Sequence, residues 1–353
     1  MFKRILVPLD GSKRAEQALP LATRLARASG GTLHLLRVDT PPQDLAWYAT
    51  EGAFVIRDAM VEERASIQRY MNRLVASEDF AGIPTRVVNA EGEAAQGILT
   101  AITEQQADVV VIGSHGRTGL SRWMMGSIAQ KVARQSPVPV LVLRTTEEGR
   151  AALFLGEGQP VQVMVPLDGS TFAEAALKPA VALSQVLSAP LPGALHLVQV
   201  LPLAAHSGIL PEEATWVAVP GGGAQVGSML SIHSTEHEPT DQGAIAINRT
   251  QALDRAHAYL LRVKSALRQE EGHDLQITTA AVIDIDIASA LLGLAEGGEV
   301  CGAHISDATA GCAMIAMATH GRSGPSRWVM GSITERVLDA TRLPLLMVRP
   351  PKQ

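Results

Sequence analysis

The sequence predicts an α/β protein made of two doubly wound domains, each with a five-stranded, mostly parallel sheet and helices on both faces. Short apolar runs alternate with amphipathic stretches along the 353 residues, and each crossover helix must bury its apolar stripe on a sheet. The segment Val7-Pro8-Leu9-Asp10-Gly11-Ser12 recurs unchanged at 165–170. A second segment, 114–127, recurs at 319–332 with ten of fourteen positions identical. These repeats indicate that one domain is present twice.

The repeats divide the chain into a first copy (residues 1–145), a linker (146–160) and a second copy (161–353). A chain of this length exceeds the size at which one hydrophobic core usually splits into two. The second copy is longer, and its extra residues concentrate at 201–248 and 297–311. Both segments are rich in Gly, Ala, Ser and Pro, so we expect surface loops there.

The first copy is predicted to begin with a buried strand and a helix capped by Ser12, because apolar residues recur at helical spacing after that serine. The pair Gly30-Gly31 ends this helix. The β-branched run at 109–112 is typical of a parallel strand buried on both faces. The predicted strands are 5–7, 32–38, 84–88, 109–112 and 140–143, and the predicted helices after the first are 58–77, 94–105 and 127–134.

The second copy repeats this order. Its predicted strands are 161–167, 194–200, 277–282, 314–317 and 345–348, with helices at 173–187 and 253–269. The last strand of each copy finishes a sheet with an unpaired edge, and we expect these two edges to pair with each other inside the chain.

Composition excludes several classes of function. The net charge is −5 and Lys and Arg form no block, so we expect no binding to nucleic acid. No stretch of 18 uncharged apolar residues occurs, and the first residues resemble a strand rather than a signal peptide. We therefore expect a cytoplasmic protein with no membrane contact.

The two cysteines, Cys301 and Cys312, lie in one irregular stretch of the second copy. In a cytosolic chain of this size they are expected to be reduced and structural. A disulfide is one alternative. A zinc site would need Cys301, His304, Cys312 and a further ligand, but paired C-x2-C knuckles are missing, so no metal site is predicted.

A glycine-rich loop carries the chemistry of the first copy. Its pattern, Gly113-x2-Gly116-x9-Gly126-Ser127, follows a buried strand and precedes a helix. Glycine lets backbone N–H groups approach an anion, and the N-terminus of the next helix offers further donors. The spacing fits neither the Walker loop nor the G-x-G-x-x-G fingerprint. Together with Asp10 at the end of the first strand, it predicts a phosphate-binding cleft.

These elements resemble tandem members of the universal stress protein family. The likeness rests on Val7-Pro8-Leu9-Asp10, the G-x2-G-x9-G-[ST] loop and the closing Val138-Pro139-Val140-Leu141-Val142. It implies an adenine nucleotide alpha hydrolase-like fold, ATP as the ligand, with Mg as an optional companion ion, and a homodimer. The residues that the resemblance assigns to the nucleotide are Pro8, Leu9, Asp10, Val38, Gly113, His115, Gly116, Arg117, Gly126, Ser127 and Ile128.

Several of these residues have simpler alternatives. Asp10 could cap the following helix, or accept a phosphoryl group, although the haloacid-dehalogenase pattern needs a second Asp where Ser12 stands. His115 could only hold the loop. Arg117 and Arg122 are each as well explained by surface ion pairs as by phosphate. The aromatic and sulfur side chains at 123–125 are expected to pack rather than to stack on adenine.

The second copy departs from the pattern. Its matching residues are Asp168, Val200, His320, Gly321, Gly331 and Ser332. However, Ala318 replaces Gly113, Ile285 stands at the place of Gly92, and Ala313 at that of Asp108. If position 318 needs a positive φ, an alanine there costs about 1–2 kcal/mol, so we expect weaker binding in the second copy.

The sequence therefore favours an ATP-binding regulator of the stress response with at most slow ATP hydrolysis, since neither loop supplies the Mg-binding pair of an efficient phosphoryl-transfer enzyme. One alternative is a nucleotidyl transferase or pyrophosphatase, although HIGH-like and S-G-G-x-D-S-like loops are absent. The other is an interaction protein with vestigial nucleotide sites.

Overall fold

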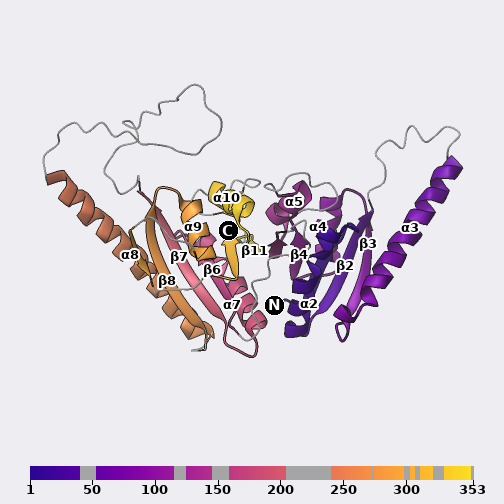
Figure 1. Cartoon of the computed structure of the whole chain (residues 1–353), viewed down its shortest axis with the longest axis horizontal. Helices are drawn as coiled ribbons and strands as arrows, with labels where there is room; N and C mark the ends of the chain where they lie inside the picture. The colour runs from indigo at the N-terminus through magenta and orange to yellow at the C-terminus, as the bar shows by residue number, and fades with distance from the viewer. Residues whose placement is uncertain are drawn as a thin grey trace, which may run out of the picture.

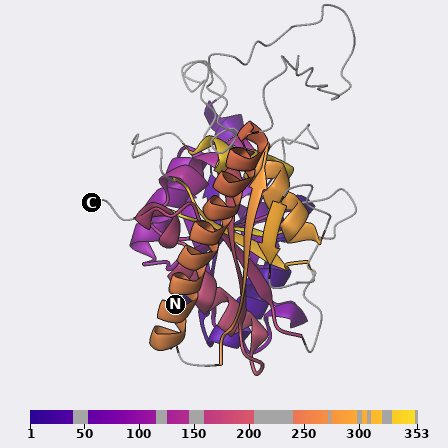
Figure 2. The same cartoon turned by 90° about the vertical axis from the view of Figure 1, so that its left-hand side faces the viewer.

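The described part of the chain forms one continuous 11-stranded sheet with helices on both faces (Figure 1). The computed structural model describes residues 1–39, 53–114, 125–144, 159–203, 240–271, 274–297, 303–306, 311–320 and 330–350. The long helices α3 and α8 lie at the two ends of the sheet. Turned by 90°, the molecule shows α8 along the strands that it covers, β7 and β8 (Figure 2).

The elements alternate along the chain as the apolar pattern predicts. Those of the first copy are β1 (Arg4–Pro8), α1 (Lys13–Glu16), α2 (Leu19–Ser29), β2 (Thr32–Asp39), α3 (Ala53–Val75), the 3₁₀ helix η2 (Glu78–Phe80), β3 (Thr85–Glu91), α4 (Ala94–Glu104), β4 (Val109–Gly113), α5 (Ser127–Gln135) and β5 (Val140–Leu143). Those of the second copy are β6 (Gln162–Pro166), α6 (Thr171–Glu174), α7 (Leu177–Ser188), β7 (Ala194–Pro202), α8 (Thr240–Glu271), β8 (Gln276–Asp284), α9 (Ile287–Glu296), β9 (Ala303–Ser306), β10 (Met314–Ala318), α10 (Ser332–Ala340) and β11 (Leu345–Val348).

The strand order is β3-β2-β1-β4-β5-β11-β10-β6-β7-β8-β9. In each copy five strands pair in parallel and in the same relative order, β3-β2-β1-β4-β5 in the first and β8-β7-β6-β10-β11 in the second. The two copies meet where β5 and β11 pair antiparallel, with Leu141 opposite Leu346 and Val142 opposite Leu345. The expected pairing of the two closing strands is confirmed.

The sheet separates two hydrophobic cores. One face is covered by α2, α3, α7 and α8, whose buried side chains form a single cluster that runs through both copies. The other face is covered by α4, α5, α9 and α10, and its cluster likewise crosses from one copy to the other. Helices on both faces of a mostly parallel sheet are the doubly wound arrangement that the sequence predicts.

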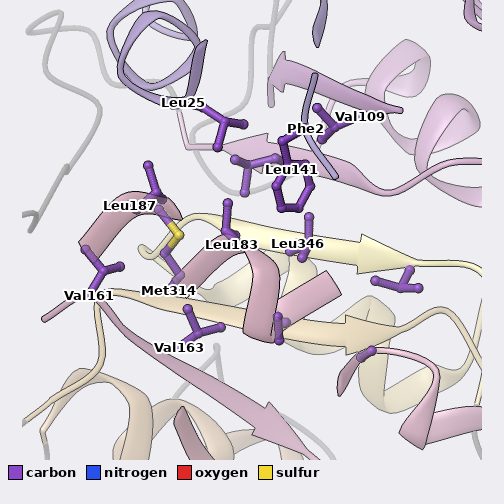
Figure 3. Packing of buried hydrophobic residues seen from close by; sticks show 14 of the residues in the cluster. Phe2, Leu25, Val109, Leu141, Val161, Val163, Leu183, Leu187, Met314 and Leu346 are labelled. Atoms are coloured by element: carbon purple, nitrogen blue, oxygen red, sulfur yellow. The ribbon is translucent and has the colours of Figure 1, made fainter. Parts of the chain in front are cut away.

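Large apolar side chains fill the space where the copies meet. Figure 3 shows Leu25 and Leu141 of the first copy facing Leu183, Leu187 and Leu346 of the second, and all five are at most 2% exposed. Because neither copy alone would cover these side chains, the contact buries apolar surface that separate domains would expose to water.

Two arginines reinforce the contact reciprocally. Arg144, just after β5, donates from Nε to the carbonyl of Thr341 at the end of α10 (2.9 Å), and Arg349, just after β11, donates from Nη1 to the carbonyl of Gln135 at the end of α5 (3.2 Å). A cation at a helix C-terminus satisfies carbonyls that have no partner in the helix and interacts favourably with the helix dipole. Burial lowers the pKa of Arg144.

Two of the segments expected to be loops contain regular structure. The helix predicted at 253–269 begins thirteen residues earlier, because α8 spans Thr240–Glu271, and this corrects the loop expected up to 248. The second expected loop, 297–311, contains β9, which pairs antiparallel with β8. β9 is only four residues long and is defined by this long-range pairing, so no local pattern announces it. Residues 204–239, within the first of these loops, and the expected linker up to 158 lie outside the described residues.

Replacing Leu141 or Leu346 by alanine should lower the free energy of unfolding by about 2–5 kcal/mol each. Each side chain is fully buried in the seam, the contact between the two copies around the paired strands β5 and β11. Urea denaturation followed by circular dichroism measures this. The control is Val61→Ala on α3, where the side chain is 60% exposed and the change should stay within about 0.5 kcal/mol. A loss below about 1 kcal/mol in both seam variants would contradict tight packing of the seam.

Candidate functional site

The topology creates a switch point at the carboxyl end of the sheet in each copy, and we refer to this place as the crevice. β1 lies between β2 and β4, and the chain leaves it on one side and returns on the other. In the second copy β6 lies in the same way between β7 and β10. Open parallel sheets bind ligands at such switch points, outside the carboxyl ends of the strands. Pro8 ends β1, Leu9 and Asp10 follow it into this crevice, and Gly113 ends the neighbouring strand β4.

A turn holds the aspartate that follows the first strand. Asp10 Oδ1 accepts a hydrogen bond from the Ser12 amide (2.9 Å), and Ser12 Oγ accepts from the Ala15 amide (3.1 Å) as the cap of α1. Gly11 between them has φ +81°, which a residue with a Cβ adopts only with strain. The predicted Ser12 cap is therefore confirmed, and Asp10 orients the capping serine rather than capping the helix itself.

The second copy reproduces this turn. Asp168 Oδ1 accepts from the amide (2.9 Å) and the hydroxyl (2.6 Å) of Ser170, which caps α6 by accepting from the Ala173 amide (3.2 Å). Gly169 has φ +84°. Both carboxylates thus stand at the same place with the same support.

The ends of the glycine loop are joined in the first copy. The Ser114 amide donates to the Leu143 carbonyl (2.7 Å), and the Ser114 carbonyl accepts from the Gly126 amide (2.8 Å). In the second copy the Thr319 amide donates to the Val348 carbonyl (2.9 Å), and the Gly331 amide donates to the Thr319 carbonyl (3.0 Å). This closure brings the start of α5 or α10 to the end of the preceding central strand.

The helices that begin at this edge differ in how their N-termini are satisfied. Ser12 caps α1, and Glu93 caps α4 by accepting from the amides of Ala95 and Gln96. α5 starts after Gly126, which offers no side chain, and its first turn holds no acidic residue. The same sequence of caps recurs in the second copy, where α10 follows Gly331 without a side-chain cap. Uncapped amides at a helix N-terminus bind anions.

The apolar candidates lie on the face of the sheet that carries α5 and α10. Val38 and Val200 are half-buried near the ends of β2 and β7, on the face that carries α4 and α9. Ile128, in the first turn of α5, is 42% exposed. Met125 is only 8% exposed and packs into the core, which confirms that it is a packing residue.

Part of the predicted site lies outside the described residues: His115, Gly116, Arg117, Arg122, Trp123 and Gly321. Their assignment to phosphate or to packing stays a prediction. His320 lies inside the described part of the chain. Its Nδ1 is 2.9 Å from Thr319 Oγ1, and its buried Nε2 has no hydrogen-bond partner there.

The sequence reasoning missed a polar group beside Asp10. Tyr70 of α3 donates to Glu16 Oε1 (2.9 Å), and Tyr259 of α8 donates to Glu174 Oε1 (2.7 Å). Burial first, and then this hydrogen bond, raise the pKa of each tyrosine far above its usual value, and the nearby Asp10 or Asp168 adds to the effect. These bonds tie the long outer helices to the turn that holds each aspartate. The signal in the sequence that could have revealed these bonds is the tyrosine that each copy carries in its long outer helix.

A second missed pair distinguishes the copies. Arg37 Nε lies 3.5 Å from Asp39 Oδ1 at the end of β2, and the Arg37 side chain is only 11% exposed. The strand register places Gln199 and Leu201 at the matching positions of β7. The first crevice therefore has an ion pair at its edge where the second has neutral side chains.

The backbone corrects the expected defect of the second copy. The described residues with positive φ are Phe2, Gln106, Gly11, Gly30, Gly82, Gly92, Gly169 and Gly297. Neither Gly113 nor Ala318 is among them, so alanine at 318 carries no strain penalty. Gly92 has φ +122°, but Ile285 at the matching place is not among the residues with positive φ, so it carries no such strain either.

The remaining substitution is remote from the crevice. Asp108 precedes β4, at the opposite edge of the sheet, where its carboxylate accepts from the amides of Lys3 (2.9 Å) and Arg4 (3.1 Å). Ala313 at the matching place in the second copy only donates its amide to Gln162. This difference concerns the start of the strands and leaves the ligand edge unchanged.

Other chemistries find little support in the described residues. No group of three or more His, Cys, Asp or Glu side chains is placed there to hold a metal ion. Cys312 is a free, buried thiol whose pKa burial raises to about 12, which opposes a nucleophilic role. Cys301 and the side chain of His304 lie outside what the structure describes. Among the helices described, none is long and apolar enough to cross a membrane.

Comparison with known proteins places these features in a family. A sequence model of the universal stress protein family matches residues 1–144 and 306–349, more than half of the chain. Part of the chain is similar to the universal stress protein YxiE of Bacillus subtilis, with 31% identity over 148 residues, 41% of this chain and 100% of that protein. A universal stress protein of Thermus aquaticus is 30% identical over 145 residues, again 41% of this chain and 100% of the relative.

Over its whole length the chain resembles a crystal structure of a universal stress protein from Archaeoglobus fulgidus. The TM-score is 0.54 at 18% sequence identity, covering 99% of each chain. A protein of unknown function from Pseudomonas aeruginosa, PA1789, also has a TM-score of 0.54, at 14% identity, covering 99% of this chain and 92% of its own. At such identities the likeness shows the fold alone.

Cys312 should be unreactive toward Ellman's reagent at pH 8 in the folded protein, because a thiol with a pKa of about 12 is almost fully protonated there. A Cys301→Ser background isolates this thiol. Absorbance at 412 nm should show no release until a denaturant is added, and then one equivalent. Rapid release from the native protein would show that Cys312 is accessible and ionised.

Proposed function

The chain belongs to the universal stress protein family, and from this premise we propose that it binds an adenine nucleotide, with ATP as the main ligand, and regulates the stress response through the occupancy of its sites. One observation carries the proposal: the uncapped N-terminus of α5 is held at the end of β4, and the neighbouring strand β1 leads into the oriented carboxylate of Asp10. An anion-binding group next to an aspartate suits a ligand with phosphates at one end and hydroxyl or amino donors at the other.

We assign the two ends of the nucleotide to different parts of the crevice. Asp10 and Val38 face the adenosine end, together with Pro8 and Leu9. The phosphates and ribose contact the loop and the helix start, namely Gly113, Gly126, Ser127 and Ile128 with His115, Gly116 and Arg117. A Mg ion accompanying the phosphates would reduce their charge.

We extend the proposal to the second copy because its frame is the same. The turn at Asp168, the half-buried Val200 and the uncapped start of α10 repeat the arrangement of the first crevice. The residues that would then contact the second nucleotide are His320, Gly321, Gly331 and Ser332. The buried Nε2 of His320 has no hydrogen-bond partner among the described residues, and in the tautomer with hydrogen on Nε2 it could donate to a phosphate oxygen.

Catalysis is expected to be slow at most. Efficient phosphoryl transfer needs side chains that hold the metal and a base that orients the attacking group. At the first crevice Asp10 accepts a hydrogen bond from the Ser12 amide, and Asp39 forms an ion pair with Arg37. We therefore assign these carboxylates to the local structure and not to catalysis. A nucleotidyl transferase or pyrophosphatase would instead turn over ATP rapidly.

Mass spectrometry of nucleotide released from purified, denatured protein tests the proposal directly. ATP or another adenine nucleotide should be released, and calorimetry on nucleotide-free protein should show ATP binding. Rapid formation of pyrophosphate or of a nucleotidyl product would favour the enzyme. If no nucleotide is released and none binds at millimolar concentration, the sites are vestigial and the proposal is wrong.

Ser127→Asp should have opposite effects on the free protein and on the complex. A carboxylate at the first position of α5 stabilises the helix by about 0.3–1 kcal/mol. The same carboxylate would face a phosphate bound at this helix start, and at an assumed separation of about 5 Å like charges repel by roughly 3 kcal/mol at an effective dielectric constant of 20. We expect the melting temperature to hold or rise while ATP affinity falls at least about tenfold.

Ser127→Asn is the neutral control for this substitution, and Ser332→Asp should affect the second crevice in the same way. Calorimetry gives the affinities and thermal denaturation the stability. Unchanged ATP affinity in the Ser127→Asp variant would remove the start of α5 from the site.

Ala318→Gly should leave ATP affinity in the second copy within about twofold of its original value, because Ala318 already has an ordinary strand conformation. The variant should instead lose about 0.5–1 kcal/mol of stability, the usual cost of a strand glycine. Calorimetry and urea denaturation check the two parts. A large gain in affinity would restore the view that alanine impairs this site.

A further inference from the structure

The two anion-binding helices lie next to each other across the seam and differ in charge. Figure 1 shows α5 and α10 on the same side of the molecule, one on each side of the junction. α5 carries Lys131 and Arg134 and no acid. α10 carries Glu335 and Asp339 against a single base, Arg336. The charge difference lies along helices whose first turns form the two proposed phosphate sites.

Glu335 is the acidic residue in the first turn of α10, the helix whose start forms the second of these sites. It stands in the first turn of α10, three residues after Ser332, whereas α5 has the neutral Gln130 at the matching position. A carboxylate in the first turn interacts favourably with the N-terminal end of the helix dipole. For the same reason it competes with a second anion, because both occupy the same positive end.

Glu335 is held by side chains of the other copy. Its Oε1 accepts from Arg134 Nη2 (2.6 Å) and from Gln130 Nε2 (3.1 Å), both on α5. The Arg134 and Glu335 side chains are 31% and 38% exposed, so the pair is partly shielded from water. The guanidinium therefore offsets the charge that Glu335 places at the start of α10.

We propose that Glu335 lowers the nucleotide affinity of the second crevice and that Arg134, from the first copy, limits this reduction. The inference rests on the proposed function and deepens it, because it names the pair of residues that makes the two sites unequal. Through this pair, a residue of the first copy affects the nucleotide affinity of the second. The cause is charge at the start of α10, whereas the backbone hydrogen bonds that join the ends of the loop are the same in both copies.

The experiment measures ATP, ADP, AMP and adenosine binding to the full-length, nucleotide-free chain by calorimetry. The second crevice is identified as the binding event that Ser332→Asp weakens. Glu335→Gln should strengthen ATP binding there about two- to fivefold, the effect of one charge at a helix terminus. Arg134→Gln should weaken it by a similar factor, and only while Glu335 is present, so the double variant should resemble Glu335→Gln alone.

Charge predicts two further readouts that a structural role would not produce. The effect of Glu335→Gln should grow with the number of phosphates and vanish for adenosine, and it should shrink as salt is raised. The control is Glu270→Gln, the same change of charge at an exposed position near the end of α8. It should leave all four affinities unchanged.

The outcomes separate the two proposals. If neither crevice binds ATP, the proposed function is wrong. If both bind ATP but Glu335→Gln leaves the second affinity unchanged, or changes adenosine binding as much as ATP binding, the inference about Glu335 is wrong and the proposed function stands. A loss in Arg134→Gln that persists in the Glu335→Gln background would likewise overturn the role given to Arg134.

Discussion

The antiparallel pairing of β5 with β11 is the contact on which the rest of the molecule depends. It joins two parallel sheets into one and lets each buried cluster run through both copies. It also places α5 and α10 close enough for Glu335 to reach Arg134, and it positions Arg144 and Arg349 on the helix ends of the opposite copy. Four-residue strands thus set the relative position of both candidate sites.

Much of the fold could be predicted from local patterns. The strand at 109–112 could be predicted because an uninterrupted apolar, β-branched run is typical of a parallel strand that is buried on both faces. The cap at Ser12 appears because its hydroxyl meets the Ala15 amide whatever lies around it. α8 was predicted too short because its first turns, 240–252, lack a regular apolar stripe, and β9 was missed because it depends on β8.

The candidate site was predictable to a lesser degree. The aspartates and the uncapped helix starts follow from motifs that the chain repeats. The bonds of Tyr70 with Glu16 and of Tyr259 with Glu174 join residues far apart in the sequence, and no spacing rule relates them. At Ala318 the sequence pattern predicted a defect that the structure does not have. A missing glycine matters only where the backbone needs a positive φ, and position 318 does not. That requirement belongs to the folded backbone and cannot be read from residue type.

The seam also frees the protein from a constraint that identical subunits obey. In a dimer with twofold symmetry every substitution occurs twice, so a contact between two different positions is always accompanied by its mirror image. Here the mirror image of Arg134 with Glu335 is Asp339 with Gln130, which cannot form the same ion pair. Covalent fusion has therefore allowed the two sides of one interface to diverge, and a molecule with the outline of a symmetric dimer can hold two non-equivalent halves.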